Sequence, residues 1–450
     1  MRSIRWFDAD RDTPSVPVDW RMASLVLAAL FFNFLFAESH STSLGLWLPL
    51  PLYAVFMATV AAILTALFFM GPALACQSRK RPILRVIQDS VGTVPAFALR
   101  VCFVLFLVFW ITAMIALPVY WWSALFRQGR ASAFESGAVA ATVLTFLFIT
   151  AHQTMHARSA LSLFTNKVAL VILFAALIHV REGWGATLVG SRWDGWYYSV
   201  WMGLSELASY MAPLGLVAAN FGYRVGGRRQ VALMVACGAA LPLLVTMLLV
   251  GLIRTATYHS SFYQPSLNPT VSMALWSHTA RSALGGRLLV AAVTVFGALR
   301  FAGRSMTDIV GVRFPGSLRG WLFVSCVIAV ISWLALHPFA DALQVALDWS
   351  GRCLGVASAI ITADLLTRKQ RDEEPQIVNW IGLTAVLAGL ATPLYISHGP
   401  VMLTPMPWWY PWLLPSYIVA FFVGSIGRLM QRSGILPQIG SRSRPLSCSQ

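Results

Sequence analysis

Glu206 is the residue whose type and position in this sequence point most directly to chemistry. It lies near the middle of the apolar stretch 196–229, one to two turns before Pro213. An ionisable side chain inside a bilayer is costly, so it is a functional candidate by default. Pro213 removes one backbone donor and crowds the preceding turn. We therefore expect a helix interruption between Ser209 and Pro213; the alternative is a mild proline kink in an ordinary packed helix.

Arg300 is a second ionisable residue in an apolar segment, again with no obvious partner nearby in the sequence. It lies near the end of its segment, within VFGALRFAGR, and its guanidinium stays protonated. The alternative is that it lies low enough to join Arg304 at the inner surface. Two acid–base pairs have the four-residue spacing that places both partners on one helix face, and such pairs can be purely architectural. They are Asp348 with Arg352 and Asp364 with Arg368.

The histidines and cysteines indicate neither a metal centre nor a disulfide framework. His152 and His156 have the spacing of a metal-binding pair, but no carboxylate or third ligand lies beside them. The 6 cysteines show no CxxC spacing, and they lie in apolar segments or beside basic loops. We expect no cofactor.

The elements that carry these residues follow from the composition. Hydrophobic residues make up 58% of the chain and charged residues 11%, with a mean hydropathy of +0.69. Soluble domains carry about 25% charged residues, so the sequence predicts a polytopic membrane protein whose partner is the lipid bilayer. Lys and Arg number 33 against 17 Asp and Glu, and most lie in short loops. Membrane topology explains this excess better than nucleic-acid binding, which we do not expect.

A helix of about 20 apolar residues crosses the hydrocarbon core, and the chain offers about twelve such segments. They form a predicted transmembrane domain over 20–428, after a cytoplasmic segment, 1–19, and before a cytoplasmic tail, 429–450, that we expect to be disordered. The predicted spans are, in order, Trp20–Phe36, Leu46–Ala75, Phe97–Trp122, Phe134–Ala151, Leu161–Val180, Trp196–Phe221, Val231–Ile253, Leu288–Ala302, Trp321–Leu336, Ala342–Leu366, Val378–Ile396 and Trp409–Ile426.

The charges in the loops orient these spans. With the N-terminus inside, most Lys and Arg residues fall in connections that face the cytoplasm, and several outer connections hold none. This asymmetry is the positive-inside rule. It predicts a multi-pass protein of the plasma (inner) membrane with both termini in the cytoplasm.

Three stretches resemble the nucleobase:cation symporter-1 family, which includes the cytosine, purine, allantoin and hydantoin permeases. The first is Asn220–Arg224 (NFGYR), followed by GGRRQ and another apolar span; the second is Ala363–Arg368 (ADLLTR) and the third Gly297–Met306 (GALRFAGRSM). The resemblance covers roughly residues 70–400. It implies an all-α polytopic fold of the leucine-transporter type, with two inverted five-helix repeats plus two helices.

This sequence departs from the family pattern where coupling ions would bind. Asn220 stands where the family has an acid, and no Gly or Pro between residues 20 and 43 interrupts the first span. The eighth span holds Thr294 and, nearby, Arg300, where similar symporters place hydroxyls that help bind sodium. We therefore expect Arg300 to substitute for a bound cation, which makes Na+ the less favoured coupling ion. Glu206 is the candidate for proton coupling, since burial lets a carboxyl group exchange protons near neutral pH.

The resemblance also implies a substrate site between spans one, three, six and eight. By position, Trp110 and Tyr210 correspond to aromatic residues that stack on a flat heterocycle in similar permeases. Asn33 and Ser209 could supply hydrogen bonds, and Glu206 lies beside them in the sixth span. The alternative for Trp110 is an apolar contact with lipid or protein.

These observations predict a secondary active transporter, a permease for a small solute such as a nucleobase or a related planar nitrogenous heterocycle. We expect it to be coupled to H+ or independent of sodium. The alternatives are an amino acid or amine transporter of the same superfamily, or a membrane sensor that does not transport. An enzyme is not expected, because the sequence has no nucleotide-binding loop, no HExxH motif and no cluster of His and Asp in the spans. No obligatory protein partner is inferred.

Overall fold

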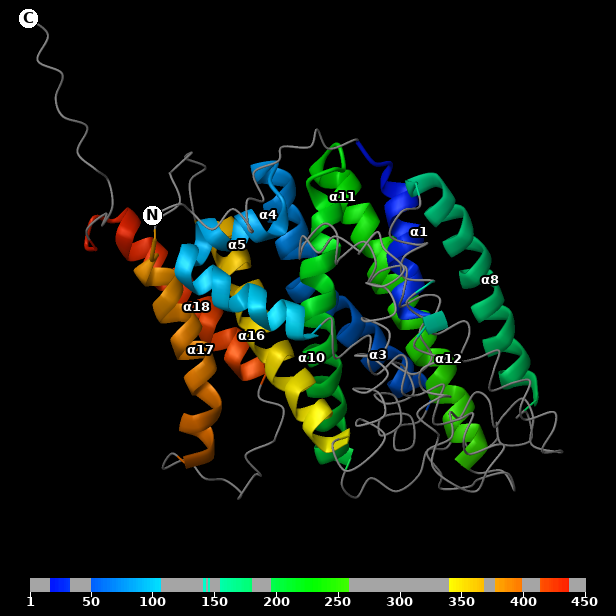
Figure 1. Ribbon diagram of the computed structural model, residues 1–450. Helices are drawn as coiled ribbons and strands as arrows, with labels where there is room; N and C mark the ends of the chain where they lie inside the picture. The colour runs from blue at the N-terminus through cyan, green and yellow to red at the C-terminus, as the bar shows by residue number, and fades with distance from the viewer. Residues whose placement is uncertain are drawn as a thin grey trace, which may run out of the picture.

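A computed structural model describes residues 17–32, 50–106, 141–142, 145, 154–179, 196–258, 340–367, 377–398 and 413–436. The predicted site residues Asn33, Trp110 and Arg300, and predicted spans eight and nine, lie outside these ranges. The regular elements within them are helices (Figure 1). They are α1 (Trp20–Phe31), α3 (Leu50–Thr65), η2 (Ala66–Met70), α4 (Gly71–Arg79), α5 (Ile83–Val91), a helix at Thr93–Phe106, α8 (Met155–His179), α10 (Trp196–Gly222), α11 (Arg228–Val235), η4 (Ala236–Ala240), α12 (Leu241–Tyr258), α16 (Ala340–Thr367), α17 (Trp380–His398) and α18 (Leu413–Arg432).

Among the described residues, three helical segments are long and apolar enough to cross a membrane: Ala54–Arg79, Met155–Ile178 and Arg228–Ile253. They coincide with the second, fifth and seventh predicted spans. Large apolar side chains on them face outward, and Val55 and Val171 are each 67% exposed. Proteins in water rarely show contiguous apolar faces of this kind, whereas lipid favours them. The chain is an all-α, multi-pass membrane protein, as the composition predicts.

The helix ends predicted to share the inner side gather at one end of the molecule, the upper end in Figure 1. Val18, before α1, donates its N–H to the carbonyl oxygen of Arg224, after α10, at 3.1 Å. At the same end, Asn379 before α17 donates its N–H to the Val91 carbonyl of α5 at 3.2 Å. The alternation of loops that the charge pattern predicts is therefore present in the described part of the chain.

α1 begins at this end and is a short helix. Asp19 caps its first turn, because its Oδ1 accepts a hydrogen bond from the Arg21 N–H at 3.1 Å. The helix ends at Phe31 after 12 residues, within the first predicted span, although no Gly or Pro lies there. A helix of that length rises about 18 Å, so α1 alone does not cross the hydrocarbon core.

The second and seventh spans each contain one π-helical turn, and each turn ends two residues before a proline. η2 is followed by Pro72 and η4 by Pro242. In an α-helix the proline ring clashes with the carbonyl four residues earlier. Here the N–H that follows each turn bonds the carbonyl five residues back, which is the wider π-helical pattern. This wider turn gives the proline ring room without breaking the span.

The turn in the second span leaves the carbonyl of Leu67 without a backbone donor, because the donor five residues on would be Pro72, which has no N–H. Two hydroxyl groups from other helices bind this acceptor. Tyr417 of α18 donates at 3.1 Å and Ser358 of α16 at 3.4 Å. A backbone group without a partner costs several kcal/mol in lipid. The contact therefore joins α16 and α18 to the second span.

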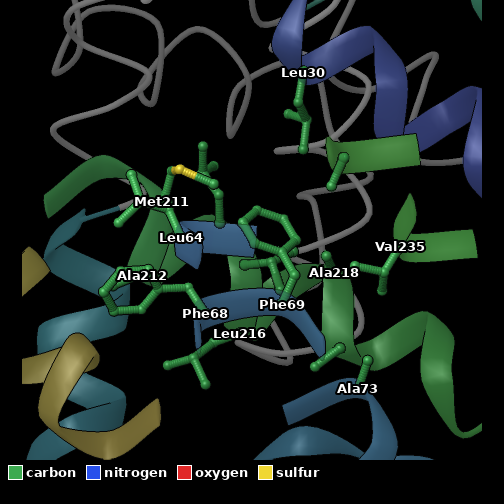
Figure 2. Packing of buried hydrophobic residues seen from close by; sticks show 14 of the residues in the cluster. Leu30, Leu64, Phe68, Phe69, Ala73, Met211, Ala212, Leu216, Ala218 and Val235 are labelled. Carbon is green, nitrogen blue, oxygen red and sulfur yellow. The ribbon is translucent and has the colours of Figure 1, made fainter. Parts of the chain in front are cut away.

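Single glycines bring the backbones of two helix pairs into contact at these π-turns. A Cβ on Gly215 of α10 would collide with the carbonyl oxygen of Phe68 in η2. A Cβ on Gly238 in η4 would lie 2.8 Å from the Cα of Ser24 in α1. Close approach through small residues is how membrane helices commonly pack. Span six thus packs on the turn of span two, and span one on the turn of span seven; Figure 2 shows the apolar side chains around them.

The helix interruption predicted over residues 209–213 is wrong. α10 is one continuous α-helix, Trp196–Gly222, with Pro213 inside it. Ala212 is 0% and Leu214 2% exposed, so neighbouring helices enclose this turn on both sides of the proline. Packing of that kind keeps a proline-containing membrane helix regular. The irregular turns lie in η2 and η4 instead.

We predict that Gly215→Ala destabilises the protein, because the new methyl group would collide with backbone rather than with a movable side chain. Overpacking of this type costs about 1–3 kcal/mol. The midpoint of thermal unfolding in detergent measures the effect. Gly227→Ala is the matched control, since a Cβ there meets nothing within 4 Å. Equal midpoints for the two variants would show that the α10–η2 contact is looser than described.

We also predict that Tyr417→Phe and Ser358→Ala are coupled. Either variant leaves one hydroxyl on the Leu67 carbonyl, whereas the double variant leaves none, and an unsatisfied buried acceptor costs about 1–3 kcal/mol. The double variant should therefore lose more stability than the sum of the single variants. Thr384→Val is the control, because the exposed Thr384 hydroxyl bonds only its own helix, at Trp380. Additive losses in a thermal-unfolding cycle would contradict the shared acceptor.

Candidate functional site

The predicted site residues of the sixth span share one face of α10. At helical spacing, positions 206, 209 and 210 lie on the side opposite Leu207, Ala208 and Met211, each of which is at most 1% exposed. The side of α10 that carries Leu207, Ala208 and Met211 is packed against protein. The backbone thus brings Glu206, Ser209 and Tyr210 to a common face, as the site requires, while their side chains lie outside the described part.

The end of α1 reaches the same part of the helix bundle. The Phe31 ring lies 5.6 Å from the Phe69 ring of η2. Phe69 also borders Gly215 of α10, where an added Cβ would lie 3.2 Å from its Cδ2. Phe69 therefore sits between the C-terminal end of α1, two residues before the predicted ligand Asn33, and the sixth span. The residue was not singled out from the sequence, because its run ALFFM gives no polar signal.

The inner half of span six is closed by apolar packing. Every residue of α10 from Met211 to Asn220 is buried. Figure 2 shows Met211, Ala212 and Leu216 of this helix beside Phe68 and Phe69 of η2. Between the candidate face at 206–210 and the inner end, α10 is therefore sealed against the described helices.

Five charged side chains form a network at the predicted inner ends of the helices. Asp364 of α16 accepts two bonds from Arg428 of α18, at 2.7 Å from Nε and 3.4 Å from Nη2. Arg79, at the end of α4, lies 3.6 Å from the same carboxylate and 4.0 Å from Asp89 of α5. Arg81 pairs with Asp89 at 3.0 Å. The network ties the second, tenth and twelfth spans to the short helix α5.

The pair of Asp364 and Arg428 is the buried centre of this network. Their side chains are 1% and 6% exposed, and Arg428 also donates to the Ser90 carbonyl of α5 at 3.1 Å. The four-residue spacing predicted that Asp364 pairs with Arg368, which lies outside the described residues. Arg428 and Arg79 were not predicted as partners, because residues so far apart in the chain leave no spacing signal.

Asn220 has a structural role at the same end. Its side-chain oxygen accepts a hydrogen bond from the Ile83 N–H at 3.1 Å. That N–H is the first of α5 and has no partner within its own helix. A neutral amide therefore caps α5 at the position where the family resemblance leads one to expect an acid.

Two other sequence predictions fall partly within the described residues. Arg352 is 3% exposed, and its guanidinium lies 5.2 Å from the centre of the Trp349 ring. The Asp348 side chain lies outside the described part, so its pairing with Arg352 stays a prediction. His156 is exposed on α8, and His152 is not described. Among the described residues, no group of three or more His, Cys, Asp or Glu could hold a metal ion.

No protein-family model and no curated protein matches this sequence, but solved structures do. Mhp1, a nucleobase-cation-symport-1 family transporter in a closed conformation with bromovinylhydantoin bound, matches with a TM-score of 0.59 and 14% identity, over 94% of this chain and 96% of that one. Its inward-facing conformation matches with a TM-score of 0.62 and 13% identity, over 95% of each chain. An outward-open, substrate-bound Na+-coupled sialic acid symporter matches with a TM-score of 0.55 and 10% identity, over 92% of this chain and 91% of that one.

These similarities each cover more than 90% of the chain and show its fold. The chain has the leucine-transporter-type fold of Mhp1 at very low sequence identity. This confirms the predicted fold class, which the family resemblance had implied.

We predict that Asp364→Asn lowers stability strongly, because it leaves the buried Arg428 without its counter-charge. Removing one partner of a buried ion pair costs about 3–5 kcal/mol, and the thermal-unfolding midpoint measures it. Arg81→Gln is the matched control: its side chain is 37% exposed, and surface pairs contribute about 0–1 kcal/mol. If Asp364→Asn cost no more than the control, the network would not hold the inner ends together.

Proposed function

We propose that this protein is a secondary active transporter that carries a small solute across the membrane by alternating access. The observation that supports this most strongly is the shared fold, which spans more than 90% of this chain and of both transporters compared above. The candidate face of α10 supports it further. In this fold class, substrate and ion sites lie near the bilayer midplane on helices such as the sixth span.

The proposed solute is small, planar and nitrogenous, such as a nucleobase or a related heterocycle. Mhp1 is described with a bromovinylhydantoin bound, which is a molecule of this kind. Trp110 and Tyr210 would stack on the ring, and aromatic faces suit that contact. Asn33 and Ser209 would donate or accept hydrogen bonds at its edge. The alternative substrate is an amino acid or amine, whose carboxylate Arg300 could bind.

The proposed transport is coupled to protons or is independent of sodium. Arg300 would supply the positive charge that a bound cation supplies elsewhere, and its guanidinium does not lose its proton at working pH. Glu206 would take up and release the proton. The transporter would lie in the plasma (inner) membrane with both termini in the cytoplasm, as the loop charges predict.

A thermal-shift screen of the purified protein, followed by uptake into proteoliposomes, tests this function. The screen compares nucleobases, hydantoins and amino acids, each with and without sodium. A ligand stabilises the protein in proportion to the logarithm of its concentration over its dissociation constant, so weak ligands can still be ranked. Uptake of the best ligand should proceed without sodium. Strict sodium dependence would overturn the proposed role of Arg300, and the absence of uptake for every stabilising ligand would overturn the transport function.

We predict that Glu206→Gln abolishes accumulation driven by a pH gradient, because the amide cannot exchange a proton. Ligand binding in the thermal-shift assay should remain, since the amide keeps the size of the carboxyl group. Asp19→Asn is the control: this acid is exposed and caps α1 outside the membrane, so its loss should leave accumulation intact. Full pH-driven accumulation by Glu206→Gln would remove Glu206 from coupling.

A further inference from the structure

α1 and α8 meet along a seam near their predicted inner ends. Asn166 of α8 donates its side-chain N–H to the carbonyl oxygen of Leu25 in α1 at 3.2 Å. Because α1 begins at Trp20, this contact lies about 8 Å along the helix axis from the start of α1. The hydrogen bond fixes which sides of the two helices face each other. It also fixes the depth of Lys167, the residue that follows Asn166.

Lys167 lies on the face of α8 that lipid covers. Its side chain is exposed, and at helical spacing it shares this face with Phe164 and Val171, which are 64% and 67% exposed. The sequence of α8 contains no Asp or Glu. Among the described residues, no carboxylate forms an ion pair with Lys167. A charged group in hydrocarbon is costly, so this ammonium group favours an anion within its reach.

A second exposed cation borders the same side of the seam. Arg21 lies one turn before Leu25 on the same face of α1 and is exposed. With Asn166 facing Leu25, the right-handed turn of each helix directs Arg21 and Lys167 to one side of the seam. The Trp20 ring lies 5.7 Å from the Arg21 guanidinium, and tryptophan is typical of the membrane interface. The long lysine stem leans toward the start of α8, at the end where α1 also begins (Figure 1).

We propose that Arg21 and Lys167 bind the phosphate group of an anionic phospholipid in the inner leaflet, with an acyl chain along Phe164 and Val171. Guanidinium and ammonium groups both donate to phosphate oxygens. A second copy of this chain fits the face less well, because the described parts of α1 and α8 expose no acid except Asp19, which caps α1. The lipid site stands on the placement of these side chains and does not depend on the proposed transport.

Lipid binding to the purified protein in detergent tests this site. Dioleoylphosphatidylglycerol and dioleoylphosphatidylcholine are titrated separately, and native mass spectrometry measures how much of each lipid is bound. The wild type should bind the anionic phosphatidylglycerol more tightly than the zwitterionic phosphatidylcholine. Lys167→Leu should weaken the binding of phosphatidylglycerol about fivefold, the factor expected for one basic residue near an anionic headgroup. Arg21→Gln should have a similar effect, and both variants should change the binding of phosphatidylcholine less.

Two further variants serve as controls. Lys167→Arg should keep the preference for phosphatidylglycerol, because it keeps the charge. Lys80→Gln should also keep it, since this exposed lysine follows α4, which packs on α10 and α16. Wild-type affinity for phosphatidylglycerol in both Lys167→Leu and Arg21→Gln would overturn the site. Equal competition by glycerol 3-phosphate would assign the two cations to a soluble phosphate instead of a lipid. A lipid-free dimer that Lys167→Leu dissociates would assign the face to a second copy, and either result would overturn the proposal.

Discussion

The carbonyl oxygen of Leu67 is the acceptor on which the packing of the second, tenth and twelfth spans depends. In a bilayer each backbone group must find its partner within the protein, and Pro72 denies Leu67 the usual one. Tyr417 and Ser358 supply hydroxyl donors from two other helices. One turn further on, a Cβ on Gly71 would collide with the Thr362 hydroxyl of α16. A local irregularity in one span thereby fixes the position of two others, since they can satisfy that carbonyl only at close range.

The same device occurs in the seventh span, and its placement follows the symmetry of the fold. In two inverted five-helix repeats, span one corresponds to span six and span two to span seven. η2 of span two packs on span six through Gly215, and η4 of span seven packs on span one through Gly238. Exchanging the repeats converts one contact into the other. Each of these close backbone contacts includes one span of the candidate site, span six in the first and span one in the second. The contact therefore holds that span in place on one side.

The sequence predicted the class of the fold well, because apolar composition and span length are local properties. The fifth and seventh spans lie close to their predicted ranges for that reason. It placed the helix irregularity wrongly. The interruption was predicted at Pro213 because this proline lies near Glu206. Whether a proline distorts a helix depends, however, on the packing around it. Pro72 and Pro242 each lie within a long apolar run and could have indicated the two π-helical turns that precede them.

Contacts between distant parts of the chain could not be read from spacing. Asp364 was expected to pair within its own helix, and Arg428 and Arg79 are the partners that the structure gives. For the candidate substrate site, the helical register of positions 206, 209 and 210 followed from sequence, while Phe69 had no polar character to mark it.

The distribution of charge along the spans separates fixed groups from groups that can change state. At the inner ends, arginines and carboxylates neutralise each other in a network that includes the buried pair of Asp364 and Arg428. Near the middle of α10 the situation differs, because no Lys or Arg lies within two turns of Glu206 along that helix. A carboxylate within a membrane span is costly unless it is neutralised, so the proposed role of Glu206 requires another span, a bound solute or a proton to neutralise it. The last two arrive and leave, whereas the inner network is part of the fold. A carboxyl group that is neutralised by a bound solute or by a proton is suited to the proposed link between solute binding and proton movement.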